Sequence, residues 1–259
     1  MLSFLLSLVL LIVGYVFYGK FVFYRERWCT FGFCQMYSMV NIKICDCVKN
    51  NLGSQVAIGS LEAAVKVKES DPMLTREISL LSGKIAVLYK LSDVSKLANI
   101  HAARGAYKKF GKDPSRYRVS SESLVRRIVK GNELYKVNNI VDINNLISIY
   151  SLHSVCAYDM DKIDSKIYFT IGKEGDSYRG IGRGMVNLSD MPVFEDSRGE
   201  FGSTTSDSRR TMIENDTRRV LMNIVSFNGD ENLDKYMNYS EDLLIKYAEG
   251  KIMSARIIK

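Results

Sequence analysis

Proline and histidine are scarce in this chain, which has 3 prolines and 2 histidines among 259 residues. The composition is 46% hydrophobic and 25% charged, which is typical of a folded globular protein and excludes a disordered chain. The length is sufficient for one large domain with a core of useful size. The two histidines, His101 and His153, do not single out a serine–histidine–aspartate or cysteine–histidine arrangement for nucleophilic catalysis.

The cysteines lack the spacing of a disulfide framework or a zinc site. No C-x-x-C pair is present, and their number is odd: Cys29, Cys34, Cys45, Cys47 and Cys156. This argues against disulfides and favours a reducing cytoplasm. Cys45 and Cys47 would point to opposite faces of a strand, which disfavours a redox or metal pair. A zinc site would need an unusual ligand set, so we expect no metal and no cofactor.

Positive charge is in excess. Lysine and arginine number 36 against 29 aspartates and glutamates, which gives a net charge of +7 and a pI of about 9.0. This excess is compatible with a polyanionic partner such as RNA or with an anionic membrane surface. Many small proteins are equally basic, so the charge alone does not choose a partner.

The first 38 residues have a different composition from the rest. Leu2 to Tyr18 carries no charge and approaches the roughly 20 apolar residues that cross a bilayer. Lys20, Arg25 and Arg27 follow, which by the positive-inside rule would keep the remaining chain in the cytoplasm. The absence of a charged n-region and of a small-residue cleavage site disfavours a cleaved signal peptide.

Two interpretations of residues 1–38 follow. They form a hydrophobic helix that anchors a cytoplasm-facing domain in the membrane, or they are a start-site artefact and the protein begins at Met39. In both cases residues 39–259 form one domain, and the protein meets a membrane only in the first case.

From Met39 onward the sequence alternates between helix and strand patterns. Helices are expected within 71–91, 93–103, 120–131, 138–150 and 231–250, and strands within 55–67, 154–159, 165–173 and 217–227. Asp71 as N-cap and Pro72 at the first helical position mark one helix start, and Ser120 or Ser121 marks another. The predicted class is α/β.

One glycine-rich stretch and one acidic stretch stand out in the second half of the chain. The sequence "GIGRG" (180–184) follows a strand, but no helix opens after it, so a glycine-rich β-turn is favoured over a phosphate loop. Three carboxylates also stand out, since Asp159, Asp161 and Asp164 directly follow a buried helix and strand.

A basic run lies between residues 107 and 127. Its cations are Lys108, Lys109, Lys112, Arg116, Arg118, Arg126 and Arg127. Tyr107, Phe110 and Tyr117 are interleaved with them, and such a mixture can grip phosphates and stack on unpaired bases. The alternative is a solvated surface whose aromatic residues belong to the core, and composition alone favours this alternative.

A polar loop, "TSDSRRT", covers residues 205–211. It combines hydroxyls, the carboxylate of Asp207 and the guanidiniums of Arg209 and Arg210. Such a cluster can bind a zwitterion or a phosphate, or it can form a self-satisfying turn network. Periodicity does not decide between these two interpretations.

Several of these segments resemble one family. "NNIVDINNLISIYSLHSVCAYDMDKID" (138–164) is similar to the phenylalanyl-tRNA synthetase beta-subunit pattern N-x-V-V-D-x-x-N, helix, A-[FY]-D-x-D-K-I. "YKKFGKDPSRYRVSSESLVRRIVKG" and "FEDSRGEFGSTTSDSRRTMIENDTRRVLMNIVSF" resemble free-standing proteins built from the B3/B4 domain of that subunit. The resemblance covers residues 106–227 and is weaker over 39–105.

This resemblance implies an α/β (α+β) domain with a small β-barrel-like sheet flanked by helices, associated with tRNA. In the synthetase the domain hydrolyses tyrosine wrongly attached to the phenylalanine tRNA. If the protein is an enzyme, we expect Asp207 to be the catalytic residue that orients the attacking water. The implied amino-acid-binding residues are Asn144, Asn145, Cys156, Tyr158, Asp159, Ser206, Ser208, Arg210 and Thr211. We further expect at least one carboxylate after residue 158 to face this pocket or to clamp its loops through Arg or Lys.

The chain also departs from the family pattern. Cys156 stands where the synthetase commonly has histidine, and Thr204 replaces a proline of the free-standing relatives. The glycine-glycine-glutamate of the synthetase is not matched at Asp207 to Arg209. The motifs for ATP and amino-acid activation are missing, so this chain alone is not expected to aminoacylate tRNA.

Two main hypotheses follow for the function. The first is a tRNA-interacting module that recognises an amino acid or aminoacyl group and hydrolyses mischarged tRNA in trans. The second is a non-catalytic binder of a free amino acid or related small molecule, with only an ancestral link to tRNA. A third, structural option is a membrane-tethered protein whose pocket is vestigial.

Overall fold

The computed structural model describes residues 39–259. The sequence-based anchor helix at residues 2–18, together with Cys29 and Cys34, lies outside these residues. Within the described part, no helix is both long enough and apolar enough to span a membrane.

Six helices and ten strands make up the described chain. The helices are α2 (Asp46–Leu52), α3 (Pro72–Leu88), α4 (Ala98–Lys109), α5 (Ser120–Val129), α6 (Asn139–Ser151) and α7 (Leu233–Ala248). The strands are β1 (Asn41–Ile44), β2 (Ala57–Ala64), β3 (Ser154–Asp159), β4 (Lys166–Ile171), β5 (Ser177–Arg179), β6 (Met185–Asn187), β7 (Pro192–Asp196), β8 (Gly199–Ser203), β9 (Arg219–Ser226) and β10 (Lys251–Ile258). The predicted mixed α/β class is confirmed.

The described strands form two open four-stranded sheets and one hairpin. One sheet has the antiparallel order β10-β2-β9-β3. The other has the order β1-β4-β7-β8, with β1 parallel to β4. The β5–β6 hairpin is separate. The β-barrel-like sheet expected from the resemblance is therefore not a closed barrel, because the strands are divided between two sheets that each keep two end strands.

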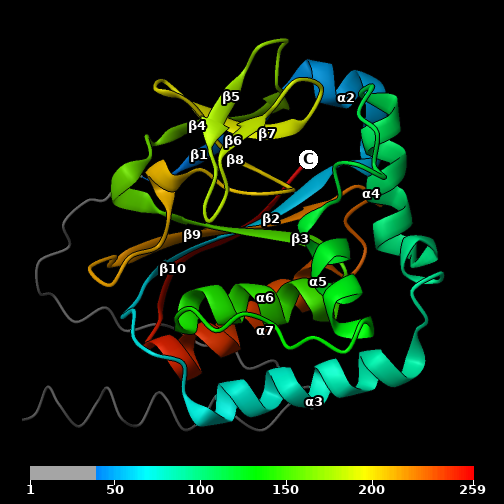
Figure 1. Cartoon of the computed structure of the whole chain (residues 1–259). Coiled ribbons are helices and arrows are strands. Elements are labelled where there is room, and N and C mark those ends of the chain that lie inside the picture. The colour runs from blue at the N-terminus through cyan, green and yellow to red at the C-terminus, as the bar shows by residue number, and fades with distance from the viewer. Residues whose placement is uncertain (1–38) are drawn as a thin grey trace, which may run out of the picture. The chain divides into compact units, whose positions relative to one another are not determined.

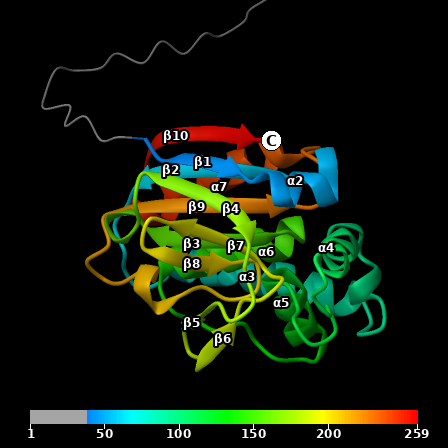
Figure 2. The same ribbon diagram turned by 90° about the horizontal axis from the view of Figure 1, so that it is seen from above.

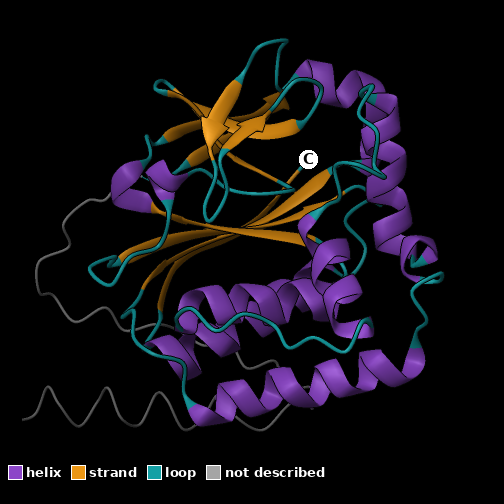
Figure 3. Ribbon diagram, in the orientation of Figure 1, coloured by secondary structure: helices purple, strands orange, loops and turns teal. Residues whose placement is uncertain are grey.

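The elements are stacked in layers, as Figure 1 and Figure 3 show. Helices α6 and α7 pack on one face of the β10-β2-β9-β3 sheet, and α3 packs on α6. The β1-β4-β7-β8 sheet lies on the opposite side. Seen from above, α4 and α5 are grouped at one end of the sheets (Figure 2).

Alternation along β9 explains the two cores. Val220, Met222 and Ile224 join the hydrophobic cluster beneath the helices, whereas Leu221 and Val225 join the cluster between the sheets. All five side chains are buried because a central strand is covered on both faces. The strand predicted within 217–227 is thus confirmed, and its period of two separates the cores.

The helix starts agree only partly with the sequence signals. Asp71 accepts a hydrogen bond from the N–H of Met73, and Pro72 opens α3, as expected. Asn138 caps α6 in the same way through the N–H of Val141. The expected cap at Ser120 or Ser121 is wrong, because the residue before α5 is Val119, which provides no side-chain cap.

The segment around the first described cysteines also differs from expectation. A strand was predicted through both residues, but β1 ends before Cys45, and Cys47 lies in α2. Cys47 is exposed, with its Sγ 3.3 Å from Oγ1 of Thr170. The chain leaves the sheet edge here, so the alternating orientation inferred for a strand does not apply.

Candidate functional site

Three tyrosine hydroxyls converge on the loop Ser203–Asp207. The hydroxyl of Tyr107 on α4 lies 2.6 and 2.8 Å from the hydroxyls of two loop threonines. Tyr158 on β3 donates a hydrogen bond of 3.0 Å to Oδ1 of Asp207. Tyr178 on β5 donates to a loop carbonyl. Burial raises the pKa of Tyr107 to about 12, so the hydroxyl stays protonated at neutral pH and can donate.

The loop also satisfies many of its own polar groups. Oγ of Ser203 accepts hydrogen bonds from the N–H groups of Thr205 and Ser206, at 3.3 and 3.1 Å. The same hydroxyl donates to the carbonyl of Ser206 at 2.8 Å. The N–H of Ser203 donates to Oδ1 of Asp207 at 3.2 Å. This is the self-satisfying turn network that was one of the two interpretations of this segment.

Asp207 retains an unusual protonation behaviour within this network. The residue as a whole is half-buried, but its carboxyl is enclosed, and burial raises its pKa to about 7 despite the hydrogen bonds from Tyr158 and Ser203, which lower it. Both of those bonds go to Oδ1. Among the residues that the structure describes, none hydrogen-bonds Oδ2. This oxygen therefore keeps acceptor capacity that the described residues do not use.

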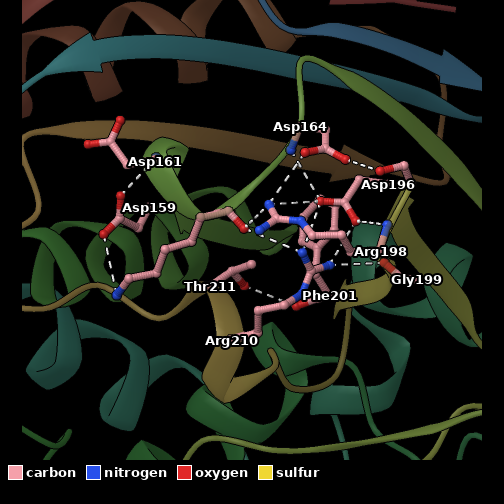
Figure 4. Close-up of polar contacts among 11 residues, drawn as sticks. Asp159, Asp161, Asp164, Asp196, Arg198, Gly199, Phe201, Arg210 and Thr211 are labelled. Carbon is pink, nitrogen blue, oxygen red and sulfur yellow. Dashed lines mark hydrogen bonds and ion pairs between the residues drawn. The ribbon is translucent and has the colours of Figure 1, made fainter.

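Arg210 is engaged inside the protein. Its guanidinium makes a bidentate pair with the buried carboxylate of Asp196, with both nitrogen–oxygen distances at 3.0 Å, and donates to the carbonyl of Gly199 at 3.0 Å (Figure 4). It also lies over the ring of Phe201, 5.4 Å from the centroid. A fork that already holds one carboxylate and one carbonyl has little capacity left for a second anion. Arg210 thus fixes the β7–β8 turn.

Ser208 and Thr211 have similar internal partners. Oγ of Ser208 accepts from the N–H of Arg210 at 3.1 Å, and Oγ1 of Thr211 donates to the carbonyl of Phe201 at 3.1 Å. Both residues are buried. Of the polar loop residues, Ser206 and Asp207 are the two proposed site residues that keep partial exposure without an internal ion pair.

The three carboxylates after β3 clamp loops. Asp159 is buried and accepts from Oγ1 of Thr217 at 2.7 Å, with Nζ of Lys162 at 3.4 Å. Asp161 pairs with Arg219. Asp164 lies 3.5 Å from Arg198 (Figure 4). The expectation that a carboxylate here clamps loops through Arg or Lys is confirmed. These groups join the turn after β3 to the loops before β8 and β9.

The remaining amino-acid-binding candidates lie in two separate layers. Cys156 and Tyr158 are buried in the core between the sheets, where the ring of Tyr158 packs edge-on against Phe201 at 4.9 Å. Asn144 and Asn145 are on α6, whose buried side chains belong to the core on the opposite face of β3. Oδ1 of Asn144 is buried without a hydrogen-bond partner. The sheet therefore separates the asparagines from the strand residues.

The basic run is divided between core and surface. Tyr107 and Phe110 are core residues, which matches the alternative interpretation of the aromatics. Lys112 is also buried, with Nζ 4.0 Å from the ring centroid of Tyr117, and burial lowers the pKa of its ammonium. Lys108 and Lys109 are exposed on α4. The buried rings of Tyr107 and Phe110 are unavailable for stacking on bases, and the buried Lys112 is unavailable for binding phosphates.

Four other cations line one hollow, which we call the basic groove. It has a volume of about 480 Å³ and is lined by Leu91, Arg118, Ser123, Arg126, Arg127, Lys130 and Asn132. No carboxylate is among the lining residues. Arg127 is held by Tyr135, whose ring centroid lies 3.9 Å from its guanidinium carbon and whose hydroxyl accepts at 2.9 Å. The groove therefore presents fixed positive charge along one face of α5.

A buried glutamate organises this face. Glu122 is fully buried in the first turn of α5. It accepts from Arg104 at 3.0 Å and from Arg126 at 2.7 Å, and Arg118 lies 3.9 Å away. One carboxylate against three guanidiniums leaves an excess of two positive charges at this end of the groove. The Glu122–Arg126 spacing of four was visible in the sequence, but the contribution of Arg104 from α4 was not.

A second hollow, the arginine cavity, adjoins the groove. Its volume is about 370 Å³, and its lining comprises Arg116, Tyr117, Arg118, Ser123, Arg183, Met185, Val186, Asn187 and Thr205. Arg118 and Ser123 are common to both hollows. Thr205 connects the cavity to the polar loop that contains Asp207. The sequence indicated Arg116 and Arg118, but Arg183 comes from the "GIGRG" turn and was not recognised as a site residue.

The described residues offer no metal centre. Among residues 39–259, no group of three or more His, Cys, Asp or Glu side chains is arranged to hold a metal ion. His153 is buried, and burial lowers the pKa of its imidazole to about 4. Its ring lies 5.6 Å from that of Tyr236.

Together, the layers and the two hollows define a mixed α/β domain with a cationic surface beside a tyrosine-held polar loop. The B3/4 domain model matches residues 102–246, which is more than half of the chain. The chain belongs to the B3/4 domain family, and the relation expected from the sequence motifs is confirmed. The match begins in α4 and ends in α7, and it includes every residue that lines the two hollows except Leu91.

The similarity of this chain to individual proteins is low. No curated protein matches the sequence. One similar solved structure is an N-terminal fragment of the phenylalanyl-tRNA synthetase beta-subunit from Pyrococcus horikoshii, with 14% sequence identity and a TM-score of 0.43. The match covers 82% of this chain and 50% of that one, so this chain spans about half the length of the fragment.

Proposed function

We propose that this domain binds RNA, and specifically a tRNA, through the basic groove. The observation that carries the proposal is the lining of that groove, where four cations gather and no carboxylate is present. RNA backbones are recognised largely through their phosphates, and arginine forks match phosphate oxygens in a bidentate manner. The resemblance of the sequence motifs to a tRNA synthetase subunit favours tRNA over other RNAs.

The position of the groove supports contact with the end of an RNA. It continues into the arginine cavity, which reaches Thr205 at the edge of the Asp207 loop. An RNA strand held in the groove would therefore bring its end close to this loop. The exposed lysines at the end of α4, Lys108 and Lys109, would extend the basic surface.

A second, finer function is hydrolysis of an aminoacyl ester on a bound tRNA. Asp207 supports it, because a carboxyl with a pKa of about 7 is ionised in part at neutral pH and can accept a proton from an attacking water. Its Oδ2 has no hydrogen-bond partner among residues 39–259. Arg210 does not serve as a free oxyanion cation, because it is paired with Asp196. Backbone N–H groups of the loop are the remaining candidates for that role.

RNA binding is tested by titrating the full chain with a tRNA over a series of salt concentrations. We expect affinity to fall steeply with salt, and the Arg127→Ala/Lys130→Ala double variant to bind more weakly with a slope reduced by about 2. The matched control is Arg76→Ala/Lys84→Ala, which removes the same two charges from the exposed surface of α3. Equal losses of tRNA affinity in both double variants would show that the groove contributes only nonspecific charge, and this would contradict the proposal.

Hydrolysis is tested with a panel of aminoacyl-tRNAs by following loss of the ester against buffer. We expect selective loss for one or two pairs, and none with Asp207→Ala. Tyr158→Phe should retain part of the activity, because it removes one bond to Asp207 but leaves the carboxyl. If no pair is hydrolysed above buffer while tRNA still binds, the catalytic function is excluded. If a free amino acid binds instead of tRNA, the non-catalytic alternative replaces the proposal.

A further inference from the structure

The arginine cavity combines three guanidiniums from separate parts of the chain. Arg116 and Arg118 come from the connection between α4 and α5, and Arg183 comes from the turn between β5 and β6. Within the described chain, Arg116 and Arg183 make no ion pair within 4.0 Å. The carboxylate nearest Arg118 is Glu122 at 3.9 Å, and it is bonded more closely to two other arginines. The lining of the cavity therefore carries three positive charges and no carboxylate.

The turn that carries Arg183 is fixed by its backbone. The N–H of Gly180 donates to the carbonyl of Gly184 at 3.1 Å, and the N–H of Ile181 donates to the carbonyl of Asp207 at 3.0 Å. A Cβ at Gly180 would lie 2.8 Å from Cγ2 of Val186, so glycine permits this close approach. The loop and the hairpin thus hold Arg183 at the cavity although guanidiniums brought together there repel one another.

The start of α5 borders the cavity, because Ser123 in the first turns of this helix lines it. A helix N-terminus carries partial positive charge from its aligned peptide groups. At α5 the carboxylate of Glu122 lies in the same first turn and offsets this charge, and the N–H of Ser120 already donates to the carbonyl of Thr204. The arginines are therefore the principal observation.

The other wall of the cavity is apolar and partly aromatic. It is formed by Tyr117, Met185 and Val186. Met185 is 69% exposed, so its side chain is accessible to a ligand. The ring of Tyr117 is fixed by the ammonium of Lys112 over it. A volume of about 370 Å³ lies within the range of small-molecule sites.

We propose that the arginine cavity binds a phosphomonoester carried on a nucleoside. The three guanidiniums would hold the phosphate, and Tyr117, Met185 and Val186 would contact the base. A dianionic phosphate suits three arginine forks better than a carboxylate, which offers one charge and two oxygens. The ligand is a free mononucleotide or the 5′-phosphorylated end of an RNA. The proposal concerns this cavity and does not require that the basic groove bind RNA.

The first experiment is calorimetric titration of the full chain, purified in mild detergent, with AMP, adenosine and inorganic phosphate. We expect AMP to bind at least about 10-fold more tightly than either component, because each supplies only one half of the contacts. Arg183→Ala and Arg116→Ala should each weaken AMP binding about 10-fold. Neither arginine has an ion pair to lose, so both variants should fold normally. Arg76→Ala on α3 is the matched control and should bind AMP like the unmodified protein.

The second experiment distinguishes the two sources of the phosphate. Two RNA oligonucleotides of one sequence are compared, one with a 5′-phosphate and one with a 5′-hydroxyl. A preference for the 5′-phosphate that is lost in Arg183→Ala assigns the site to an RNA end. Equal binding of the two oligonucleotides together with tight AMP binding assigns it to a free mononucleotide.

Three results would overturn the proposal: equal affinity for AMP and adenosine, equal affinity for AMP and inorganic phosphate, or AMP binding unchanged in Arg183→Ala. The groove variant Arg127→Ala/Lys130→Ala separates this outcome from that of the proposed function. It should weaken tRNA binding and leave AMP binding unchanged. If AMP does not bind while tRNA binding is intact, the nucleotide site is excluded and the proposed RNA-binding function is unaffected.

Discussion

The hydroxyl of Tyr158 donates a hydrogen bond of 3.0 Å to Oδ1 of Asp207, and it does so from the core between the two sheets. This contact joins a fully buried strand residue to the one loop carboxyl whose pKa lies near neutrality. It fixes the position of the carboxyl while leaving Oδ2 without a partner among the described residues. The bond therefore connects the hydrophobic core with the candidate chemistry of the loop.

The raised pKa of Asp207 predicts a pH-dependent stability. Burial raises this pKa from 3.8 to about 7 in the folded protein, so the folded state binds the proton more tightly than the unfolded state. Asp207 therefore costs no stability below pH 3.8, and stability falls as pH rises towards 7. Asp207→Asn keeps an acceptor for Tyr158 and Ser203 but cannot ionise. Urea unfolding should show the variant more stable than the unmodified protein above pH 7 and equal to it near pH 3.8. A constant difference across this range would contradict the assignment.

The pair of Arg210 and Asp196 predicts a pH dependence of stability opposite to that of Asp207. Burial alone would raise the pKa of Asp196, but the hydrogen bonds from Arg210 and from backbone N–H groups outweigh it, and the net pKa is lowered. Its stabilisation is present above the unfolded pKa and is lost as pH falls through the folded pKa. Arg210→Lys loses the bidentate fork, so we expect a loss of about 1–3 kcal/mol at neutral pH and acid unfolding at a higher pH. The control Arg209→Lys, at an exposed position, should leave both quantities unchanged.

Lys112 tests whether a cation of the basic run belongs to the core or to the proposed RNA-binding surface. Its ammonium is buried over Tyr117 and donates to the carbonyl of Ser189. Lys112→Met should lower the free energy of unfolding by about 1–3 kcal/mol, because that carbonyl loses its partner. At a temperature where the variant is folded, tRNA affinity and its salt dependence should not change. A reduced salt slope would place Lys112 on the RNA-binding surface after all.

Gly202 and Gly105 allow a comparison of two glycines, one in a tightly packed place and one in open space. A Cβ at Gly202 would lie 2.0 Å from the hydroxyl oxygen of Tyr158, whereas Gly105 in α4 has nothing within 4 Å of such an atom. Gly202→Ala must displace a buried tyrosine, and we expect a loss of more than about 3 kcal/mol. Gly105→Ala should raise stability by about 0.5–1 kcal/mol, since alanine is the better helix former. Thermal unfolding of both variants tests this contrast.

Local signals in the sequence determined the elements and the family. Asp71 and Pro72 predicted the start of α3 because a cap and a fixed φ act within one turn. Alternation predicted β4 and β9 because burial on a strand repeats every two residues. The "GIGRG" segment was correctly predicted as a turn between strands. Each of these features depends on neighbours in the chain, so the sequence alone contains the information.

Tertiary structure decided which charged and polar side chains are available. Arg210 is occupied by Asp196, 14 residues away, and Glu122 by Arg104, 18 residues away. Lys112 is buried although it belongs to a basic run, and Arg183 reaches a cavity with Arg116 from a turn that showed no sign of a site. The cost of burying a charge and the gain from pairing it depend on groups brought together only by folding. For this reason the sequence supplied the family and many of the elements, and only the folded chain shows which charged and polar side chains are paired or buried.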